Sequence, residues 1–308
     1  MWNMRSQEPH QTTPYIDVMI PFWGDPELLR LAIESVRRQT NPNWRLVVVD
    51  DCYPQPVEEL VASYGDGRMS YERNQSNLGT TGNYQRCLEL CTAPYVMFFG
   101  CDDIMLPNYV DLVLGIFSRY PNASIVQPGF RIIDSAGKPA LPLRDFVKRF
   151  ILAPRGRSIK VLRGEKAAFS LARGDWLSWP SLAFRAYDVK RFPFRDGLPI
   201  IQDLGLLIDM IIDGCTLVYA PAVAFNWRRH NQSAAATSAV TGRRFPDERR
   251  YLSLAADLLQ EKGWNRAAWA ARLRLLSRLD ALTCLPAAIR RGQWVGIKAI
   301  FKHAFSIG

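Results

Sequence analysis

Residues 96–107 read VMFFGCDDIMLP, an apolar run typical of a buried strand that ends in two adjacent aspartates. Neighbouring carboxylates at a strand end repel each other, so this stretch predicts that something offsets their charge. Divalent cations such as Mg²⁺ and Mn²⁺ are commonly held by one or two carboxylates together with phosphate oxygens of a substrate. Asp102 and Asp103 are therefore candidate metal ligands; the alternative is a solvated turn in which one of them caps the next helix.

The same strand belongs to a longer alternation of β-branched or aromatic runs with helical patterns. Strands are expected over residues 16–20, 46–50, 69–72, 95–99, 124–127 and 217–220. Helices are expected over residues 26–36, 57–64, 80–91 and 107–120, and residues 130–175, rich in Arg, Lys, Pro and Gly, are expected to form a mobile loop. The alternation predicts an α/β fold whose mostly parallel sheet is covered by helices on both faces.

Ligands of such sheets bind beyond the carboxyl ends of the strands. Three predicted strands end in Pro21-Phe22-Trp23, in Asp50-Asp51 and in Cys101-Asp102-Asp103, so two carboxylate pairs are expected to converge on one crevice. The loop NLGTTGN, residues 77–83, precedes a helix. It either offers backbone N–H groups to an anion or forms an ordinary helix-capping turn.

The composition argues against several classes of protein. With 48% hydrophobic and 11% aromatic residues over 308 positions, the chain can bury a large core. Its six cysteines form no CxxC pair, which argues against a zinc site or a disulfide framework and favours a reducing, cytoplasmic setting. The polar start of the chain lacks the apolar core of a signal peptide, and no uncharged run is long enough to span a membrane, so a soluble or peripheral protein is expected.

The net charge of +10 is concentrated in the last quarter of the chain. Residues 1–227 carry 24 basic and 24 acidic side chains, whereas residues 228–308 carry 15 and 5, which together give the 39 and 29 of the whole chain. The basic residues alternate there with Trp and Phe, which suits helices that lie on an anionic membrane. Helices packed on the main domain with a solvated basic face are an equal alternative. A nucleic-acid-binding region is a further one, although no recognised module supports it.

The chain resembles the nucleotide-sugar-binding half of the inverting family 2 glycosyltransferases, which have the GT-A fold, in four segments that occur in the family's order: IDVMIPFWGDPELLRLAIESVRRQT, RLVVVDD, NLGTTGNYQRCL and YVMFFGCDDIMLP. The resemblance is close over residues 15–130 and looser over residues 175–233. It implies a flexible arm over residues 1–14 and a GT-A (Rossmann-like) domain over residues 15–233, with a nucleotide-sugar-binding half (15–130) and an acceptor half (131–233). A basic helical region follows over residues 234–308.

The resemblance also implies the donor residues. Those assigned to the nucleotide sugar are Pro21, Phe22, Trp23, Asp51, Asn77, Gly79, Asn83, Asp102, Arg228 and His230. In the family, Asp51 hydrogen-bonds the base, and Asp102 and Asp103 share the ribose and the divalent metal, with His230 as a further metal ligand. Gly100 stands where the family often has the first acid of this motif.

On the acceptor side, Asp203 in IIQDLGLL resembles the family's catalytic base, and Gln202 replaces the Glu that usually precedes it. Trp179 and Gln202 are the expected acceptor contacts. Arg228 and His230 in NWRRHNQS keep the spacing of an Arg-x-His segment that lies near the diphosphate in the family.

The activity implied is transfer of a sugar, with inversion and with Mn²⁺ or Mg²⁺, from a nucleotide-diphosphate sugar to the hydroxyl of a saccharide or lipid-linked acceptor. UDP- or dTDP-sugars are the expected donors by family habit. The implied role is bacterial-type cell-surface polysaccharide or glycolipid synthesis, in the cytoplasm or peripherally on the inner face of the cell membrane. The alternatives are a nucleotide-sugar-binding protein without transferase activity and a nucleic-acid-binding protein, although no nucleic-acid partner is expected.

Overall fold

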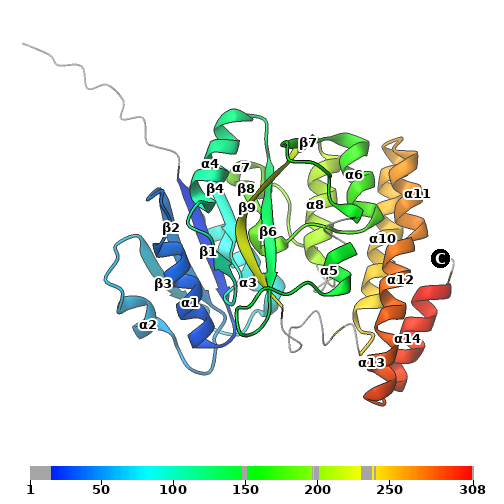
Figure 1. The fold of residues 1–308 in the computed structure, drawn as a ribbon, viewed down its shortest axis with the longest axis horizontal. Coiled ribbons are helices and arrows are strands. Elements are labelled where there is room, and N and C mark those ends of the chain that lie inside the picture. The colour runs from blue at the N-terminus through cyan, green and yellow to red at the C-terminus, as the bar shows by residue number, and fades with distance from the viewer. Residues whose placement is uncertain are drawn as a thin grey trace, which may run out of the picture.

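The computed structural model describes residues 15–147, 151–195, 197, 201–229, 238 and 241–306 (Figure 1). Its strands are β1 (Ile16–Phe22), β2 (Trp44–Asp50), β3 (Met69–Arg73), β4 (Tyr95–Phe98), β5 (Ile104–Met105), β6 (Ile125–Ile133), β7 (Lys160–Leu162), β8 (Ala183–Arg185) and β9 (Leu217–Arg228). Its helices are α1 (Pro26–Arg37), α2 (Glu58–Ala62), α3 (Gly79–Leu90), α4 (Tyr109–Arg119), α5 (Leu143–Val147), α6 (Gly164–Arg173), the 3-10 turn η2 (Trp179–Ser181), α7 (Ala186–Val189), α8 (Gln202–Ile212), α10 (Arg244–Glu261), α11 (Asn265–Leu273), α12 (Leu275–Thr283), α13 (Leu285–Arg290) and α14 (Trp294–Phe305).

Within the described residues, nine strands form one sheet in the order β3-β2-β1-β4-β8-β6-β9-β5, and β7 pairs with β9. Strands β3, β2, β1 and β4 are parallel to one another, which confirms the parallel arrangement predicted for this half. The registers place Phe22 opposite Asp50 and Asp50 opposite Arg73. The strand ends that carry the predicted donor residues therefore lie at one edge of the sheet.

The second half of the sheet is mixed. Strand β8 lies antiparallel between β4 and β6, β9 runs parallel to β6, and β5 and β7 lie antiparallel to β9. Because Ile104 of β5 pairs with Asn226 of β9, the turn that carries Asp102 and Asp103 lies against the end of β9. The two-residue strand β5 is thus the last strand of the sheet beside β9, whereas the β4–β8 pair joins the two halves.

Helices cover both faces of the sheet, and each face buries its own apolar cluster. Helix α1 shows how the sequence produces this arrangement. The Asp25 carboxylate accepts a 2.8 Å hydrogen bond from the Glu27 N–H, and Pro26 is the first helical residue. Buried side chains recur along one side of the helix at helical spacing: Leu29, Ala32, Ile33 and Val36. These features confirm the helix expected after the first strand.

The expectation of a mobile loop over residues 130–175 is wrong in important parts. Strand β6 continues to Ile133, and helix α6 spans Gly164–Arg173. Helix α6 buries Ala167, Ala168 and Leu171, so small residues form its contact face. The basic and glycine-containing composition concealed this helix because alanines give a weak apolar periodicity.

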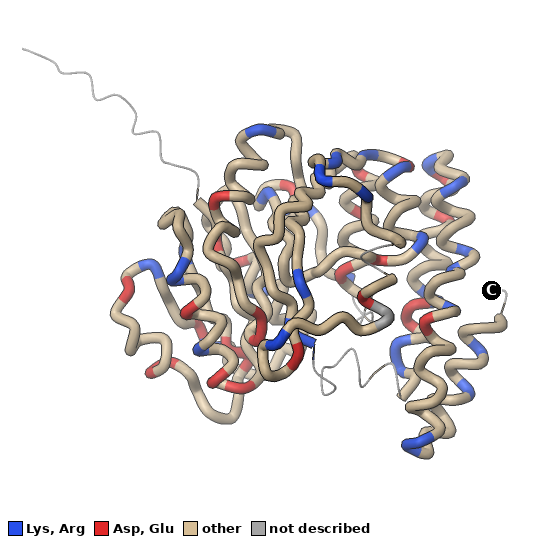
Figure 2. Tube along the Cα trace, viewed as in Figure 1, with Lys and Arg blue, Asp and Glu red and all other residues tan. Residues whose placement is uncertain are grey.

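The C-terminal helices pack against α6 and α8 (Figure 1). Helix α10 contacts α8, where the Tyr251 hydroxyl donates a 3.2 Å hydrogen bond to the Gly205 carbonyl. Helix α11 contacts α6, and the Arg266 N–H donates to the Glu165 Oε1 at 2.7 Å. Figure 2 shows basic residues distributed along these helices. Over the described part of the chain, no helix combines the length and the apolar character that crossing a bilayer requires.

A buried histidine lies among the arginines of these helices. His303 of α14 is fully buried, its ring centroid lies 4.9 Å from that of Phe245, and its Nε2 shares a 2.6 Å hydrogen bond with the Ser277 Oγ. Burial is the main reason why the pKa of His303 is lowered to about 4. Nearby side chains modulate the shift: Glu248 opposes it, and the positive charges of Arg249, Arg274 and Arg244 favour it.

We expect His303 to make the fold acid-sensitive. The pKa of His303 is about 4 in the folded protein and about 6.5 in the unfolded chain. The unfolded chain therefore binds a proton at a higher pH, and the free energy of unfolding decreases as the pH falls from about 6.5 to about 4. The loss is on the order of 1–3 kcal/mol. Thermal unfolding of the wild type and of His303→Leu from about pH 7 to about pH 4.5 measures it. The wild-type Tm should fall more steeply; parallel profiles would show that His303 is not the titrating group.

Candidate active site

The two carboxylates that follow β2 have different surroundings. Asp50 is fully buried, and its Oδ2 accepts hydrogen bonds from Arg73 at 2.5 Å and from the Tyr71 hydroxyl at 2.6 Å. Its Oδ1 accepts from the Tyr53 N–H at 2.7 Å. This network ties β2 to β3, so the expectation that the Asp50-Asp51 pair faces the crevice is wrong for Asp50.

Asp51 follows Asp50 at the carboxyl end of β2 and is also buried. Its Oδ1 accepts hydrogen bonds from the Leu78 N–H at 2.8 Å and from the Asn74 side chain at 2.9 Å. No described residue donates to its Oδ2, which is therefore available to a ligand. Asn83 lies behind this group: it accepts from Asn74 at 3.0 Å and donates to the Val49 carbonyl at 3.0 Å. The buried side chain of Asn83 thus positions Asn74, which in turn donates a hydrogen bond to Asp51.

The loop before α3 contains a local turn. The Gly79 N–H donates to the Asn77 Oδ1 at 3.0 Å, and Gly79 has a φ of +71°, which favours glycine. The N-cap residue Leu78 makes no side-chain capping hydrogen bond, and its N–H donates to Asp51. Direct contact of Asn77 or Gly79 with a nucleotide sugar stays a prediction.

Aromatic side chains lie at the end of β1. Trp23 is 51% exposed, and its ring meets that of Tyr53 edge-on with 5.4 Å between the centroids. Phe22 is fully buried and packs against Tyr53 with 5.3 Å between the ring centroids. Phe22 therefore supports Tyr53 from the core, which corrects its assignment as a ligand contact. Pro21 and Tyr53 are partly exposed, and contact of Pro21 or Trp23 with a nucleotide sugar stays a prediction.

The Asp102 and Asp103 side chains converge beside Gly100. A Cβ on Gly100 would collide with the Asp103 Oδ2 and would lie 3.3 Å from the Asp102 Oδ1. Both carboxylates thus approach one point, and no side chain fits there. This close approach explains why a glycine occupies the position where the family often has an acid.

Arg228, at the end of β9, holds the aspartate turn in place. Its N–H donates to the Asp103 Oδ1 at 2.7 Å, and its Nε donates to the Asp102 carbonyl at 2.6 Å. Its Nη1 donates to the Asp134 and Ser135 carbonyls at 3.1 and 3.0 Å. Because these carbonyls engage the buried guanidinium, the structure gives Arg228 a positioning role in place of the predicted contact with the nucleotide sugar.

The electrostatics of the turn fit a divalent cation. Burial raises the pKa of Asp103 well above its usual range, and the charge of Asp102 raises it as well, against the Arg228 N–H hydrogen bond. Among the described residues, no group of three or more His, Cys, Asp or Glu could hold a metal. Two convergent carboxylates nevertheless suit a hard cation that takes its remaining ligands from a diphosphate and water. His230, the other predicted ligand, lies outside the described residues.

Asp203 lies at the start of α8, as predicted, and Gly214 ends that region with a φ of +99°. The Asp203 Oδ1 accepts a 2.8 Å hydrogen bond from the Leu204 N–H. Gln202 is buried, and its Oε1 has no hydrogen-bond partner in the described structure. Trp179 stacks on Phe98 with 5.4 Å between the ring centroids and 7° between the planes. The contacts of Gln202 and Trp179 with an acceptor stay predictions.

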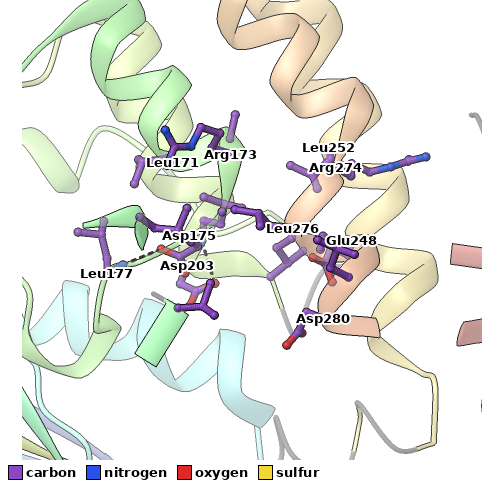
Figure 3. Close-up of a pocket in the computed structure, with 18 of the residues that line it drawn as sticks. Leu171, Arg173, Asp175, Leu177, Asp203, Glu248, Leu252, Arg274, Leu276 and Asp280 are labelled. Carbon is purple, nitrogen blue, oxygen red and sulfur yellow. Dashed lines mark hydrogen bonds between the residues drawn. The ribbon is translucent and has the colours of Figure 1, made fainter. Parts of the chain in front are cut away.

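A pocket of about 510 Å³ opens beside Asp203 (Figure 3). One wall comes from α6, the segment after it, η2 and the start of α8, and the other comes from α10 and α12. Arg229 also lines it: its Nη2 donates to Asp145 at 2.8 Å, and its guanidinium lies 3.6 Å from the Trp227 ring centroid. The buried Nε of Arg229 has no hydrogen-bond partner within the described residues.

Several residues at the site were not predicted from the sequence. Tyr53 could have been, since this aromatic residue lies two positions after the Asp50-Asp51 pair. Asn74 had no such signal, because its role depends on Asp51 and Asn83 coming together in the fold. The pocket wall from α10 and α12 could not be predicted from any local motif either.

Comparisons with known proteins agree with this geometry. Residues 17–161 match the family model described as glycosyl transferase family 2. A putative colanic acid biosynthesis glycosyl transferase, WcaA of Escherichia coli K12, is 29% identical over 106 residues, which are 34% of this chain and 38% of WcaA. An uncharacterized protein of Sinorhizobium fredii, y4gI, is 31% identical over 120 residues, which are 38% of this chain and 13% of y4gI. The chain thus spans well under half the length of these relatives.

Solved structures resemble almost the whole chain. Residues 1–349 of Staphylococcus aureus TarS match with a TM-score of 0.65 and 12% identity, over 94% of this chain and 81% of that one. The mannosyltransferase PcManGT from Pyrobaculum calidifontis, solved with GDP-Man and Mn²⁺, matches with a TM-score of 0.61 and 14% identity, over 96% of this chain and 86% of that one. Residues 17–161 thus match glycosyl transferase family 2, and the chain shares the GT-A fold of these solved structures.

Proposed function

We propose that this protein transfers a sugar from a nucleoside-diphosphate sugar to an acceptor hydroxyl, with inversion at the anomeric carbon. The observation that carries the proposal is the convergence of the Asp102 and Asp103 carboxylates at the sheet edge that also holds Asp51, together with a pocket beside Asp203. A role in bacterial cell-surface polysaccharide or glycolipid synthesis is supported by two relatives. WcaA is named for colanic acid biosynthesis, and WfgD of Escherichia coli is named as a glucosyltransferase acting on GlcNAc-diphosphoundecaprenol.

Each residue of the proposed donor site has a separate task. The Oδ2 of Asp51 would accept a hydrogen bond from the base, beside the contacting rings of Trp23 and Tyr53. Asp102 and Asp103 would hold Mn²⁺ or Mg²⁺, which when bound acts as a Lewis acid toward the diphosphate leaving group. Arg228 keeps the two carboxylates in position through the Asp103 Oδ1 and the Asp102 carbonyl. A UDP- or dTDP-sugar is the proposed donor; TarS has been solved with UDP-GlcNAc.

Asp203 is the proposed general base. It would take the proton of the acceptor hydroxyl as that oxygen attacks the anomeric carbon from the side opposite the diphosphate. The helix start fixes the carboxylate, because the Leu204 N–H donates to its Oδ1. Asp203 also lines the pocket in which an acceptor would lie.

Binding of the donor tests the function directly. Thermal unfolding should be measured with a panel of nucleotide sugars, each with Mn²⁺, with Mg²⁺ and with a chelator. We expect one uridine or thymidine sugar to raise the Tm in a metal-dependent manner, and the same donor to support transfer to a saccharide acceptor. Stabilisation without any transfer or donor hydrolysis would favour a non-catalytic binding protein, and no stabilisation by any donor would refute the proposal.

We also propose that the protein works at the cytoplasmic face of a membrane. Helix α14 exposes Trp294 (74%), Val295 (78%) and Phe305 (67%) on a segment that also carries Lys298 and Lys302. Aromatic and basic residues on one helix are the combination that binds anionic bilayers. The nucleic-acid alternative has less support. It rested on the basic residues of the C-terminal region, and several arginines there already have partners within the protein: Arg244 with Asp280, Arg272 with Asp257, and Arg274 and Arg278 with the Ser306 carbonyl.

Vesicle flotation checks the membrane contact. The full chain should float with vesicles that contain phosphatidylglycerol and not with neutral vesicles. The double variant Trp294→Ser, Phe305→Ser should lose flotation, because it removes two exposed aromatic side chains and leaves the charge unchanged. Tyr187→Ser is the matched control, since Tyr187 of α7 is another exposed aromatic residue. Equal flotation of the double variant and the wild type would contradict this placement.

A further inference from the structure

The pocket beside Asp203 is mainly apolar. Leucines approach it from both walls: Leu152, Leu171, Leu177, Leu252, Leu276 and Leu279. Figure 3 shows Leu171 and Leu177 on the side of α6 and the segment after it, and Leu252 and Leu276 on the side of the C-terminal helices. A site for a free sugar is rich in hydrogen-bonding groups, whereas an aliphatic lining favours a ligand with apolar surface.

The charged residues of the pocket are largely compensated within the protein. Arg244 donates to Asp280 at 2.7 Å and to Glu248 at 3.4 Å. Arg229 pairs with Asp145 at 2.8 Å. A ligand therefore meets mostly aliphatic side chains in the body of the pocket.

The pocket lining also holds polar groups. Asp203 lines the pocket, and so does Arg229, whose buried Nε has no hydrogen-bond partner in the described structure. A carboxylate that can accept a proton and an unsatisfied cationic donor in the lining of a mainly apolar cavity suit an amphiphile. Its hydroxyl-bearing end would reach Asp203 while its apolar part lies along the leucines.

We propose that this pocket binds the apolar aglycone of an amphiphilic acceptor, which makes the acceptor a lipid-linked sugar and excludes a plain soluble saccharide as the preferred substrate. The proposal rests on the proposed function, because it identifies the pocket ligand as the acceptor of the transfer. The C-terminal helices then determine acceptor specificity, since Leu252, Leu276 and Leu279 form their side of the pocket.

Binding of two glucosides tests the chemistry without requiring transfer. Octyl β-glucoside, kept below its micelle concentration, and methyl β-glucoside share the sugar and differ in the aglycone. Calorimetry on the full chain should show at least about tenfold tighter binding of the octyl compound, because burial of several methylene groups favours it. Equal affinities for the two glucosides would overturn the proposal.

Two substitutions locate the binding. Leu276→Asn places an amide on the pocket wall, and Leu275→Asn makes the same change at the adjacent residue, which is 61% exposed and does not line the pocket. The first should abolish the preference for octyl glucoside, and the second should keep it. Gly174→Leu fills the pocket instead, because a Cβ there lies 2.8 Å from the Leu152 Cδ1 and 3.4 Å from the Leu276 Cδ1, both ends of flexible side chains.

The outcomes separate this inference from the proposed function. Donor-induced thermal stabilisation shows for each variant that the fold is intact. If Leu276→Asn and Gly174→Leu both still bind octyl β-glucoside more tightly than methyl β-glucoside, the pocket assignment is wrong even if the enzyme transfers sugar. If both variants lose this difference in affinity and the protein has no transferase activity, the pocket is an amphiphile site and the proposed transfer reaction is refuted.

Discussion

With Asp203 replaced by asparagine, we expect sugar transfer to fall by about 10²–10⁴-fold, the usual contribution of a general base. Asparagine preserves the size of the side chain, and its carbonyl oxygen can still accept the 2.8 Å hydrogen bond from the Leu204 N–H. It cannot take the proton of the acceptor hydroxyl. The loss should therefore appear in kcat, with the KM for the donor unchanged, in steady-state kinetics on purified protein.

Asp213→Asn is the matched control for this experiment. Asp213 follows the same helix at its other end, is well exposed and forms an ion pair with Arg191. The control should keep the wild-type rate. If Asp203→Asn folds normally, binds the donor and still transfers sugar at a near-normal rate, Asp203 is not the base.

The second large effect is expected for Asp103→Asn. This change keeps an oxygen that can accept the 2.7 Å hydrogen bond from the Arg228 N–H, but it removes one of the two negative charges beside Gly100. We expect a loss of about 10²–10³-fold in kcat, the range observed when one group that stabilises a developing negative charge is removed. The Mn²⁺ concentration that gives half-maximal activity should rise as well, because the hard cation loses a carboxylate ligand.

A titration of activity with Mn²⁺ measures both effects. Asp66→Asn serves as the control, because Asp66 pairs with Arg68 beside β3 and lies outside the site. Its metal dependence should match that of the wild type. Full activity of the wild type in excess chelator, or an unchanged metal requirement in Asp103→Asn, would rule out the assignment of the cation to Asp102 and Asp103.

The N-terminal half was predictable because its signals are local. The near-continuous apolar runs predicted the parallel strands almost in full. Asp25 and Pro26 predicted where α1 begins. The second half was harder. Strands β5 and β8 have two and three residues, too few to show alternation, and they exist because neighbouring strands bond to them.

Which carboxylates were structural could not be predicted from the sequence. Asp50 and Asp51 are adjacent and identical in type, yet only Asp50 accepts hydrogen bonds from Arg73 and Tyr71 of β3 and from the Tyr53 N–H. Arg228 was predicted near the diphosphate because of its spacing from His230. Its partners, the carbonyls of Asp102, Asp134 and Ser135, became visible only once β9 lay beside β5 and β6.

The end of β9 has a consequence for how the two substrates bind. Arg228 holds the aspartate turn, and the next residue, Arg229, lines the pocket that we propose for the acceptor. One peptide unit therefore connects the two sites, and the Arg229 N–H anchors it to the Ile133 carbonyl at 2.8 Å. An acceptor that shifts Arg229 must also disturb the support of Asp102 and Asp103. Occupancy at one site should thus be felt at the other, and product-inhibition patterns should reveal a compulsory order of substrate addition.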